Sequence, residues 1–117
     1  MGLDQIIAKQ AELDALTSEV MVAPHSVSLG PKQSAILDGR PGKTFRIVID
    51  NNDEDLDAVI YVLSNGKWIY NNYSLASGDT TRKTFQMGPS GHIRVYNWTD
   101  NKFSPNPQVT FSLRAVK

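Results

Sequence analysis

Five aromatic residues in the second half of the chain have the chemistry that most suggests a binding role. They are Trp68, Tyr70, Tyr73, Tyr96 and Trp98. Aromatic rings on a β surface can stack on the faces of sugars, and neighbouring asparagine amides can hydrogen-bond sugar hydroxyls. This combination is typical of a carbohydrate-binding module, whose partner would be a glycan. The favoured interpretation is nevertheless that the rings fill the protein core or a subunit interface, as Trp and Tyr commonly do.

A run of acidic residues offers the oxygen ligands that a calcium ion prefers. The carboxylates belong to Asp50, Asp53, Glu54, Asp55 and Asp57. The run lacks the central glycine and the final glutamate of an EF-hand loop. A solvated loop, whose negative charge discourages strands from pairing at the edge, is therefore the favoured interpretation. We expect neither a bound metal nor a cofactor.

The two histidines of the chain, His25 and His92, each stand beside a predicted turn. No glycine pattern of a nucleophile elbow is present, and neither histidine has a metal-ligand spacing to a second histidine or carboxylate. Both are predicted to be ordinary surface residues. The sequence therefore predicts a protein that is not an enzyme.

Composition limits the remaining possibilities. The chain has 117 residues, of which 40% are hydrophobic, and no cysteine, which suits one domain with a modest core and no disulfide. Basic and acidic residues number 12 each and no Lys/Arg cluster occurs along the sequence, so nucleic-acid binding has little support. No apolar run reaches the length of a membrane span, and the N-terminus does not resemble a signal peptide. We expect synthesis in the cytosol, with incorporation into a virion as one destination.

The N-terminal segment, residues 3–20, predicts one amphipathic helix. Apolar residues recur there at three- and four-residue spacings, without glycine or proline. The apolar stripe consists of Leu3, Ile6, Ile7, Leu13, Leu16 and Val20. Because a helix this short is marginal alone in water, the stripe must be buried, either on the β domain of the same chain or against other copies. Polar residues interrupt its heptad spacing.

The position and charge of this segment slightly favour self-association, with three copies as the preferred number. The segment is terminal, and four acidic residues and one lysine give residues 1–23 a formal charge of −3, which leaves +3 for the rest. Residues 20–24 could then form a stalk between the helix and the β domain. The six residues of the stripe are the predicted oligomerisation residues.

From residue 25 onward, short alternating runs separated by turn residues predict strands. The runs cover residues 25–29, 33–37, 45–50, 58–63, 67–70, 80–87, 92–98 and 109–115, with 71–78 as a loop. The run at 58–63 is apolar on both faces, which indicates a central strand covered on both sides. Asn65 and Gly66 predict a tight hairpin turn between two of the runs.

About eight strands with no helix between them predict an antiparallel two-sheet β-sandwich, either jelly-roll or immunoglobulin-like. The strand number favours the jelly-roll. We expect an N-terminal helix and linker over residues 1–23 and a β-sandwich domain over 24–117. The predicted function is that of a non-enzymatic, self-associating assembly protein, such as a phage decoration or fibre protein or a surface appendage subunit. Its partner would be further copies or a larger particle such as a capsid, and a carbohydrate-binding module is the alternative.

Overall fold

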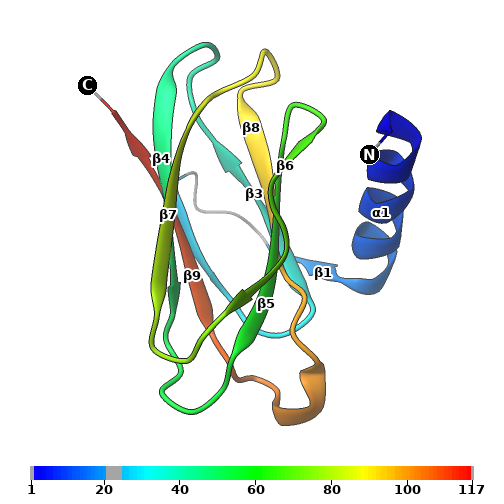
Figure 1. Ribbon diagram of the computed structural model, residues 1–117, viewed down its shortest axis with the longest axis vertical. Coiled ribbons are helices and arrows are strands. Elements are labelled where there is room, and N and C mark those ends of the chain that lie inside the picture. The colour runs from blue at the N-terminus through cyan, green and yellow to red at the C-terminus, as the bar shows by residue number, and fades with distance from the viewer. Residues whose placement is uncertain (1, 21–24, 117) are drawn as a thin grey trace.

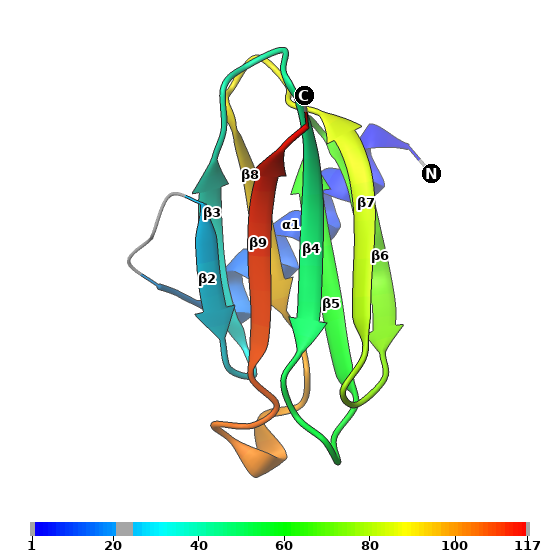
Figure 2. The same ribbon diagram turned by 90° about the vertical axis from the view of Figure 1, so that its left-hand side faces the viewer.

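The computed structural model describes residues 2–20 and 25–116, in which two β-sheets and one α-helix form three layers (Figure 1). Sheet A has the strand order β1 (Ser18–Glu19), β3 (Gln33–Asp38), β8 (His92–Asn97), β5 (Ala58–Ser64) and β6 (Lys67–Leu75). Sheet B has the order β2 (Ser26–Leu29), β9 (Val109–Ala115), β4 (Thr44–Asn51) and β7 (Thr80–Gln86). Helix α1 (Leu3–Leu16) lies on the outer side of sheet A, and a short 3₁₀ helix (Asn101–Phe103) precedes β9 (Figures 1 and 2). No helix in these described residues is long and apolar enough to cross a membrane.

The strand pairing is that of a jelly-roll. Strand β2 pairs with β9, β3 with β8, β4 with β7 and β5 with β6, and each of these four pairs is antiparallel. The pairs are nested, so the chain folds as one long double ribbon wrapped into two sheets. The predicted two-sheet sandwich is confirmed, and this pairing selects the jelly-roll over the immunoglobulin-like alternative. The short strand β1 differs, because it pairs with β3 in parallel.

The space between the sheets is filled by the alternate side chains that the sequence pattern predicts. Strand β4 contributes Ile47 and Ile49, and β9 contributes Phe111, all with no exposed surface. The run at 58–63 became β5, whose Ile60 belongs to the core between the sheets while Tyr61 belongs to a separate cluster with helix α1. The prediction that this strand is covered on both faces is therefore confirmed.

The helix is shorter than predicted, since it ends at Leu16 and not near residue 20. The hydroxyl of Thr17 donates to the carbonyl of Leu13 at 2.7 Å, and the Thr17 and Ser34 hydroxyl oxygens lie 3.1 Å apart. These bonds, and the low helix propensity of the β-branched Thr17, end the helix here. Ser18 and Glu19 then pair with β3. Val20 therefore leaves the helix and packs against the core between the sheets, so its predicted place on the helical stripe is wrong. Residues 21–24 of the proposed stalk, and the domain boundary after residue 23, lie outside the described residues.

The loop predicted at residues 71–78 is also wrong in part, because β6 continues to Leu75. The pairing of β5 with β6 shifts register near Val62, and Asn72 has a positive φ of 49°. Such an irregularity breaks the alternation of side chains that sequence reasoning relies on. Beyond it the ladder resumes, with the buried Leu75 opposite Ala58.

Candidate functional site

The outer face of sheet A gathers aromatic side chains beneath helix α1. Leu13 of the helix, Tyr61 of β5 and Tyr96 of β8 are buried together, and the partly buried Trp68 and Trp98 pack around them. The Tyr61 ring meets that of Trp68 edge-on at 5.4 Å between centroids and that of Trp98 at 6.5 Å. We call these five residues the aromatic cluster. Its geometry is that of a packed joint between helix and sheet.

Polar contacts orient the helix on this cluster. The hydroxyl of Tyr96 donates a hydrogen bond of 2.7 Å to Oδ1 of Asp14. Burial raises the pKa of Tyr96, and the hydrogen bond to Asp14 raises it further, so the phenol stays neutral. Nζ of Lys9 lies 5.3 Å from the centre of the Tyr61 ring. Nζ of Lys32 lies 3.3 Å from the centre of the Trp98 ring.

The predicted aromatic residues do not form one exposed platform. Tyr70 is 2% exposed in the core between the sheets, where its hydroxyl pairs with that of Thr81 at 3.0 Å. Tyr96 is fully buried, and Trp68 and Trp98 are each partly covered. Tyr73, at 38% exposed, is the most open of the five. This arrangement favours packing over sugar stacking as the role of these rings.

One atom of the aromatic cluster is left without a partner. Among the described residues, the indole Nε1 of Trp68 is buried and has no hydrogen bond. An unpaired buried donor costs about 1–3 kcal/mol. This unpaired N–H group therefore offsets part of the free energy that the apolar contacts between helix and sheet contribute.

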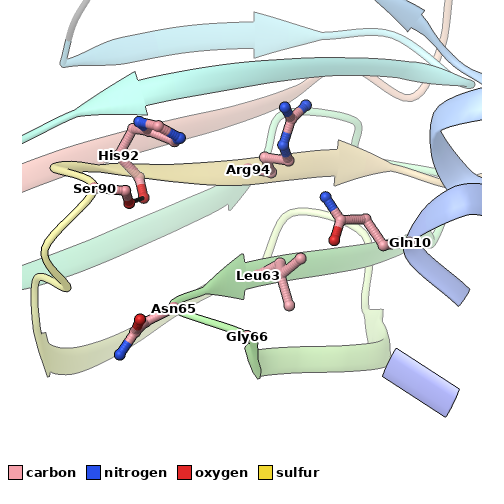
Figure 3. Close-up of a pocket in the computed structure, with 7 residues that line it drawn as sticks. All are labelled: Gln10, Leu63, Asn65, Gly66, Ser90, His92 and Arg94. Carbon is pink, nitrogen blue, oxygen red and sulfur yellow. Dashed lines mark hydrogen bonds between the residues drawn. The ribbon is translucent and has the colours of Figure 1, made fainter. Parts of the chain in front are cut away.

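A polar hollow of about 160 Å³ lies beside the helix, and Figure 3 shows its lining. Gln10 reaches into it from α1, His92 and Arg94 project from β8, and Asn65 stands at the β5–β6 turn (Figure 3). The hydroxyl of Ser90 bonds the backbone carbonyl of His92 at 3.4 Å, not its ring, so the two do not form a nucleophile–base pair. The hollow can hold water or a small polar group.

The predicted oligomerisation stripe is divided by the docking of the helix. Leu13 is fully buried on sheet A and Ile6 is partly buried. In contrast, Leu3 is 62% exposed, Ile7 is 55% exposed and Leu16 is 61% exposed. The helix therefore buries part of its apolar stripe against sheet A of the same chain and leaves three large aliphatic side chains exposed to solvent.

The acidic loop uses its carboxylates to hold its own shape. Oδ1 of Asp53 accepts hydrogen bonds of 2.8 Å from the backbone N–H groups of Asp55 and Leu56. Oδ1 of Asp57 accepts one of 3.0 Å from the N–H of Ser77. Within residues 2–20 and 25–116, no three His, Cys, Asp or Glu side chains gather in a way that could hold a metal ion. These bonds support the interpretation of a solvated structural loop.

Sequence reasoning missed two members of this joint, Tyr61 and Asp14. Tyr61 could have been found, because it lies on the second apolar face of the run at 58–63. Asp14 carried no such signal. Its pairing with Tyr96 joins residues 82 positions apart and depends on where the helix docks.

Comparisons with known proteins place the fold and no more. No protein-family model matches the chain, and no curated protein matches it. Among solved structures, the secreted serine protease VesC from Vibrio cholerae matches over 93% of this chain with 13% identity and a TM-score of 0.51. This chain spans about a quarter of that protease, since the match covers 27% of it.

Two further structures are similar at lower scores. A de novo designed double-stranded β-helix matches over 78% of this chain and 95% of its own, with 18% identity and a TM-score of 0.45. The Aeromonas hydrophila protein PliG, a periplasmic inhibitor of g-type lysozyme, matches over 86% of this chain and 96% of its own, with 18% identity and a TM-score of 0.42. At these identities the likenesses concern the fold and not the activity.

Proposed function

We propose that this protein is a non-enzymatic assembly module that self-associates through the solvent-facing side of helix α1. The observation that carries the proposal is the exposure of Leu3, Ile7 and Leu16, each more than half exposed on one short helix. Leu3 and Ile7 are four residues apart and therefore lie on the same side of the helix, whereas Leu16 lies at its C-terminal end. Exposed apolar side chains of this kind can mark sites of interaction with other proteins. A virion decoration or fibre protein, or a surface appendage subunit, is the context that we propose for such a module.

The energetics of the helix support this proposal. An isolated helix of 14 residues is marginal in water, and this one is docked through a single fully buried side chain, Leu13. Full burial of a Leu or Ile side chain contributes about 1.5–3 kcal/mol. Contact with a neighbouring copy would recover part of that energy for the three exposed side chains. Self-association therefore stabilises both the helix and its docked position.

The fold is compatible with both functions that the sequence suggests, because jelly-rolls occur in viral capsid proteins and in lectins. The carbohydrate-binding alternative has less support, since it needs exposed rings. Four of the five predicted aromatic residues pack in the core or beneath the helix, and only Tyr73 is classed as exposed among them. Assembly remains the function that the geometry supports best.

Light scattering coupled to size-exclusion chromatography, over a range of protein concentrations, tests the proposal. We expect the wild-type protein to associate and the double variant Leu3→Ser/Ile7→Ser to be monomeric, with unchanged far-UV circular dichroism. Phe103→Ser is the matched control, because Phe103 is 57% exposed but lies far along the chain in the 3₁₀ helix. A wild-type protein that stays monomeric at every concentration, or a double variant that associates normally, contradicts the proposal. The same measurement gives the number of copies, for which three stays the prediction.

A further inference from the structure

Within residues 2–20 and 25–116, no helix covers the outer face of sheet B, whereas the outer face of sheet A carries helix α1. Figure 2 shows β2, β9, β4 and β7 toward the viewer with the helix behind them. The side chains on this face alternate with those of the core, and most are serine or threonine. Their hydroxyls pair across strands, as between Ser28 and Thr110 at 2.7 Å. The face is therefore lined by small polar side chains, with the partly exposed Val48 as an aliphatic side chain near its middle.

Three arginines lie near one another on this face. Arg46 of β4 stands directly opposite Arg114 of β9, and Arg82 of β7 stands opposite Val48, two residues farther along β4. Strand geometry places Arg82 about 8 Å from Arg46 and about 12 Å from Arg114, measured between Cα atoms. We call this surface the arginine face. Like charges directly opposite each other in a sheet are destabilising.

No ion pair among the described residues neutralises the positive charge of the arginine face. In the described part of the chain, the ion pairs are Lys9 with Glu12 and Arg94 with Glu19, and neither involves the three arginines. The nearest acidic residue of the same face, Asp50, accepts a hydrogen bond from the hydroxyl of Thr80. A partner that brings carboxylates to this face would relieve the repulsion between the arginines.

Helix α1 presents such carboxylates on its solvent side. Asp4 and Glu12 are exposed, and so are the small Ala8, Ala11 and Ala15 together with the larger Gln5 and Ile7. Asp4 and Glu12 are eight residues apart, which is about 12 Å along the helix axis. This spacing is close to that of Arg82 and Arg114. Because alanine side chains are small, this side of the helix could come close to the hydroxyl side chains on the outer face of sheet B.

We propose that the arginine face receives helix α1 of a second copy of this chain, with Asp4 and Glu12 against the arginines. This inference rests on the proposed self-association and names its second surface. The helix and the arginine face lie on opposite sides of the protein (Figure 1). The contact is therefore head-to-tail, and copies add one after another into a ring or a filament, not into a two-fold dimer.

Charge reversal on each surface tests this pairing. The face variant is Arg46→Glu/Arg114→Glu, which keeps a like-charged pair across the strands, and the helix variant is Asp4→Lys/Glu12→Lys. Each variant alone should lose association at least tenfold by sedimentation velocity. An equimolar mixture of the two should regain it, because a basic helix then meets an acidic face. The control Arg40→Glu/Lys102→Glu makes two charge reversals outside sheet B and helix α1 and should associate as the wild type does.

Salt and a polymeric anion separate the remaining outcomes. Raising salt from about 0.1 M to about 1 M shortens the screening length to roughly 3 Å and should weaken the wild-type association. If both charge variants associate normally while Leu3→Ser/Ile7→Ser does not, the arginine face is not the docking surface, although the proposed function stands. A monomeric wild type overturns both. Heparin binding by the wild type, without recovery in the mixture, overturns a second copy as the occupant.

The folding of the face variant is checked by circular dichroism. If Arg46→Glu/Arg114→Glu does not fold, Arg46→Gln/Arg114→Gln replaces it, since glutamine keeps the length of the side chain without its charge. This neutral variant should still lose association several-fold and should lose most of the salt dependence. Unchanged association with unchanged salt dependence would overturn the inference.

Discussion

Replacing Leu13 by alanine should detach helix α1 from the sandwich without unfolding the sandwich. Leu13 has no exposed surface, because it is buried against Tyr61 and Tyr96 on the outer face of sheet A. It therefore lies outside the core between the two sheets. The buried core between the sheets is formed by residues of the strands and their connections and by no residue of the helix. The substitution should therefore destabilise the docking of the helix on sheet A and leave the stability of the sandwich itself nearly unchanged.

The size of the effect follows from the burial of the side chain. Truncating a fully buried leucine to alanine costs about 3–5 kcal/mol, from lost burial and the cavity left behind. A cost of about 3 kcal/mol changes the ratio of docked to undocked helix more than a hundredfold. The contacts that remain include the partial burial of Ile6, the hydrogen bond from Tyr96 to Asp14 and the contacts of Lys9 with the rings, the last two each worth about 1 kcal/mol. They are too few to hold a helix that is marginal alone.

Tryptophan fluorescence and circular dichroism measure the detachment. Trp68 and Trp98, the two tryptophans of the chain, both pack around Leu13, so detachment should shift their emission to longer wavelength. The helical signal in the far-UV spectrum should fall, while the main thermal transition of the sandwich stays nearly unchanged.

Leu16→Ala is the matched control for this experiment. It makes the same substitution on the same helix at a position that is 61% exposed, so its effect on docking within a monomer should stay within about 0.5 kcal/mol. Both variants are measured at concentrations at which the protein is monomeric, because Leu16 is one of the side chains proposed to contact a neighbouring copy. If Leu13→Ala keeps the wild-type emission and helical signal, the helix is held by contacts other than this leucine. If it unfolds the whole protein in one transition, the helix and the sandwich form one cooperative unit and the reasoning is refuted.

Two further substitutions test the turn and the tyrosine pair. Gly66→Val should destabilise the protein by about 1–3 kcal/mol in thermal or urea unfolding, because Asn65 and Gly66 both have positive φ, 51° and 71°, as a type I′ turn requires; an unchanged midpoint would contradict this. Tyr96→Phe should loosen the helix by about 1 kcal/mol through loss of the bond to Asp14. Because the native pKa of Tyr96 is raised above its unfolded value, its contribution to stability is complete below about pH 10 and is lost as pH rises toward the native pKa. Melting temperatures from pH 9 to 12 should therefore fall more steeply for the wild type than for Tyr96→Phe, and equal slopes would contradict the raised pKa of Tyr96, which burial causes first and the bond to Asp14 second.

Alternation of side chains was enough to predict the sandwich, because each strand buries one face and turn residues separate the strands. The same pattern at residues 58–63 showed that a second layer must cover Tyr61. It could not show which segment supplies that layer, since burial is a property of a face and not of a pair of residues. The helix was predicted from its own spacing, and its docking on β5 and β8 appears only in three dimensions.

The arginine face could not be predicted from the sequence, because its residues are far apart along the chain. Arg46, Arg82 and Arg114 are separated by more than thirty residues each, so the sequence contains no basic cluster. The jelly-roll pairing brings them together, because it aligns β4 with β7 on one side and with β9 on the other. The register of strands far apart in sequence decides this, and it depends on the whole fold.

The two contacts proposed for helix α1 use different sides of it and therefore support each other. Leu13 faces sheet A of the same chain, whereas Asp4 and Glu12 face solvent, where a neighbouring copy would bind. A neighbour that binds only the docked helix stabilises docking by mass action. Leu13→Ala should consequently weaken association although Leu13 touches no neighbour, and raising the concentration of this variant should return its tryptophan emission toward that of the wild type. Emission that does not depend on concentration, in a variant that still associates, would show that the helix binds its neighbour in the undocked state.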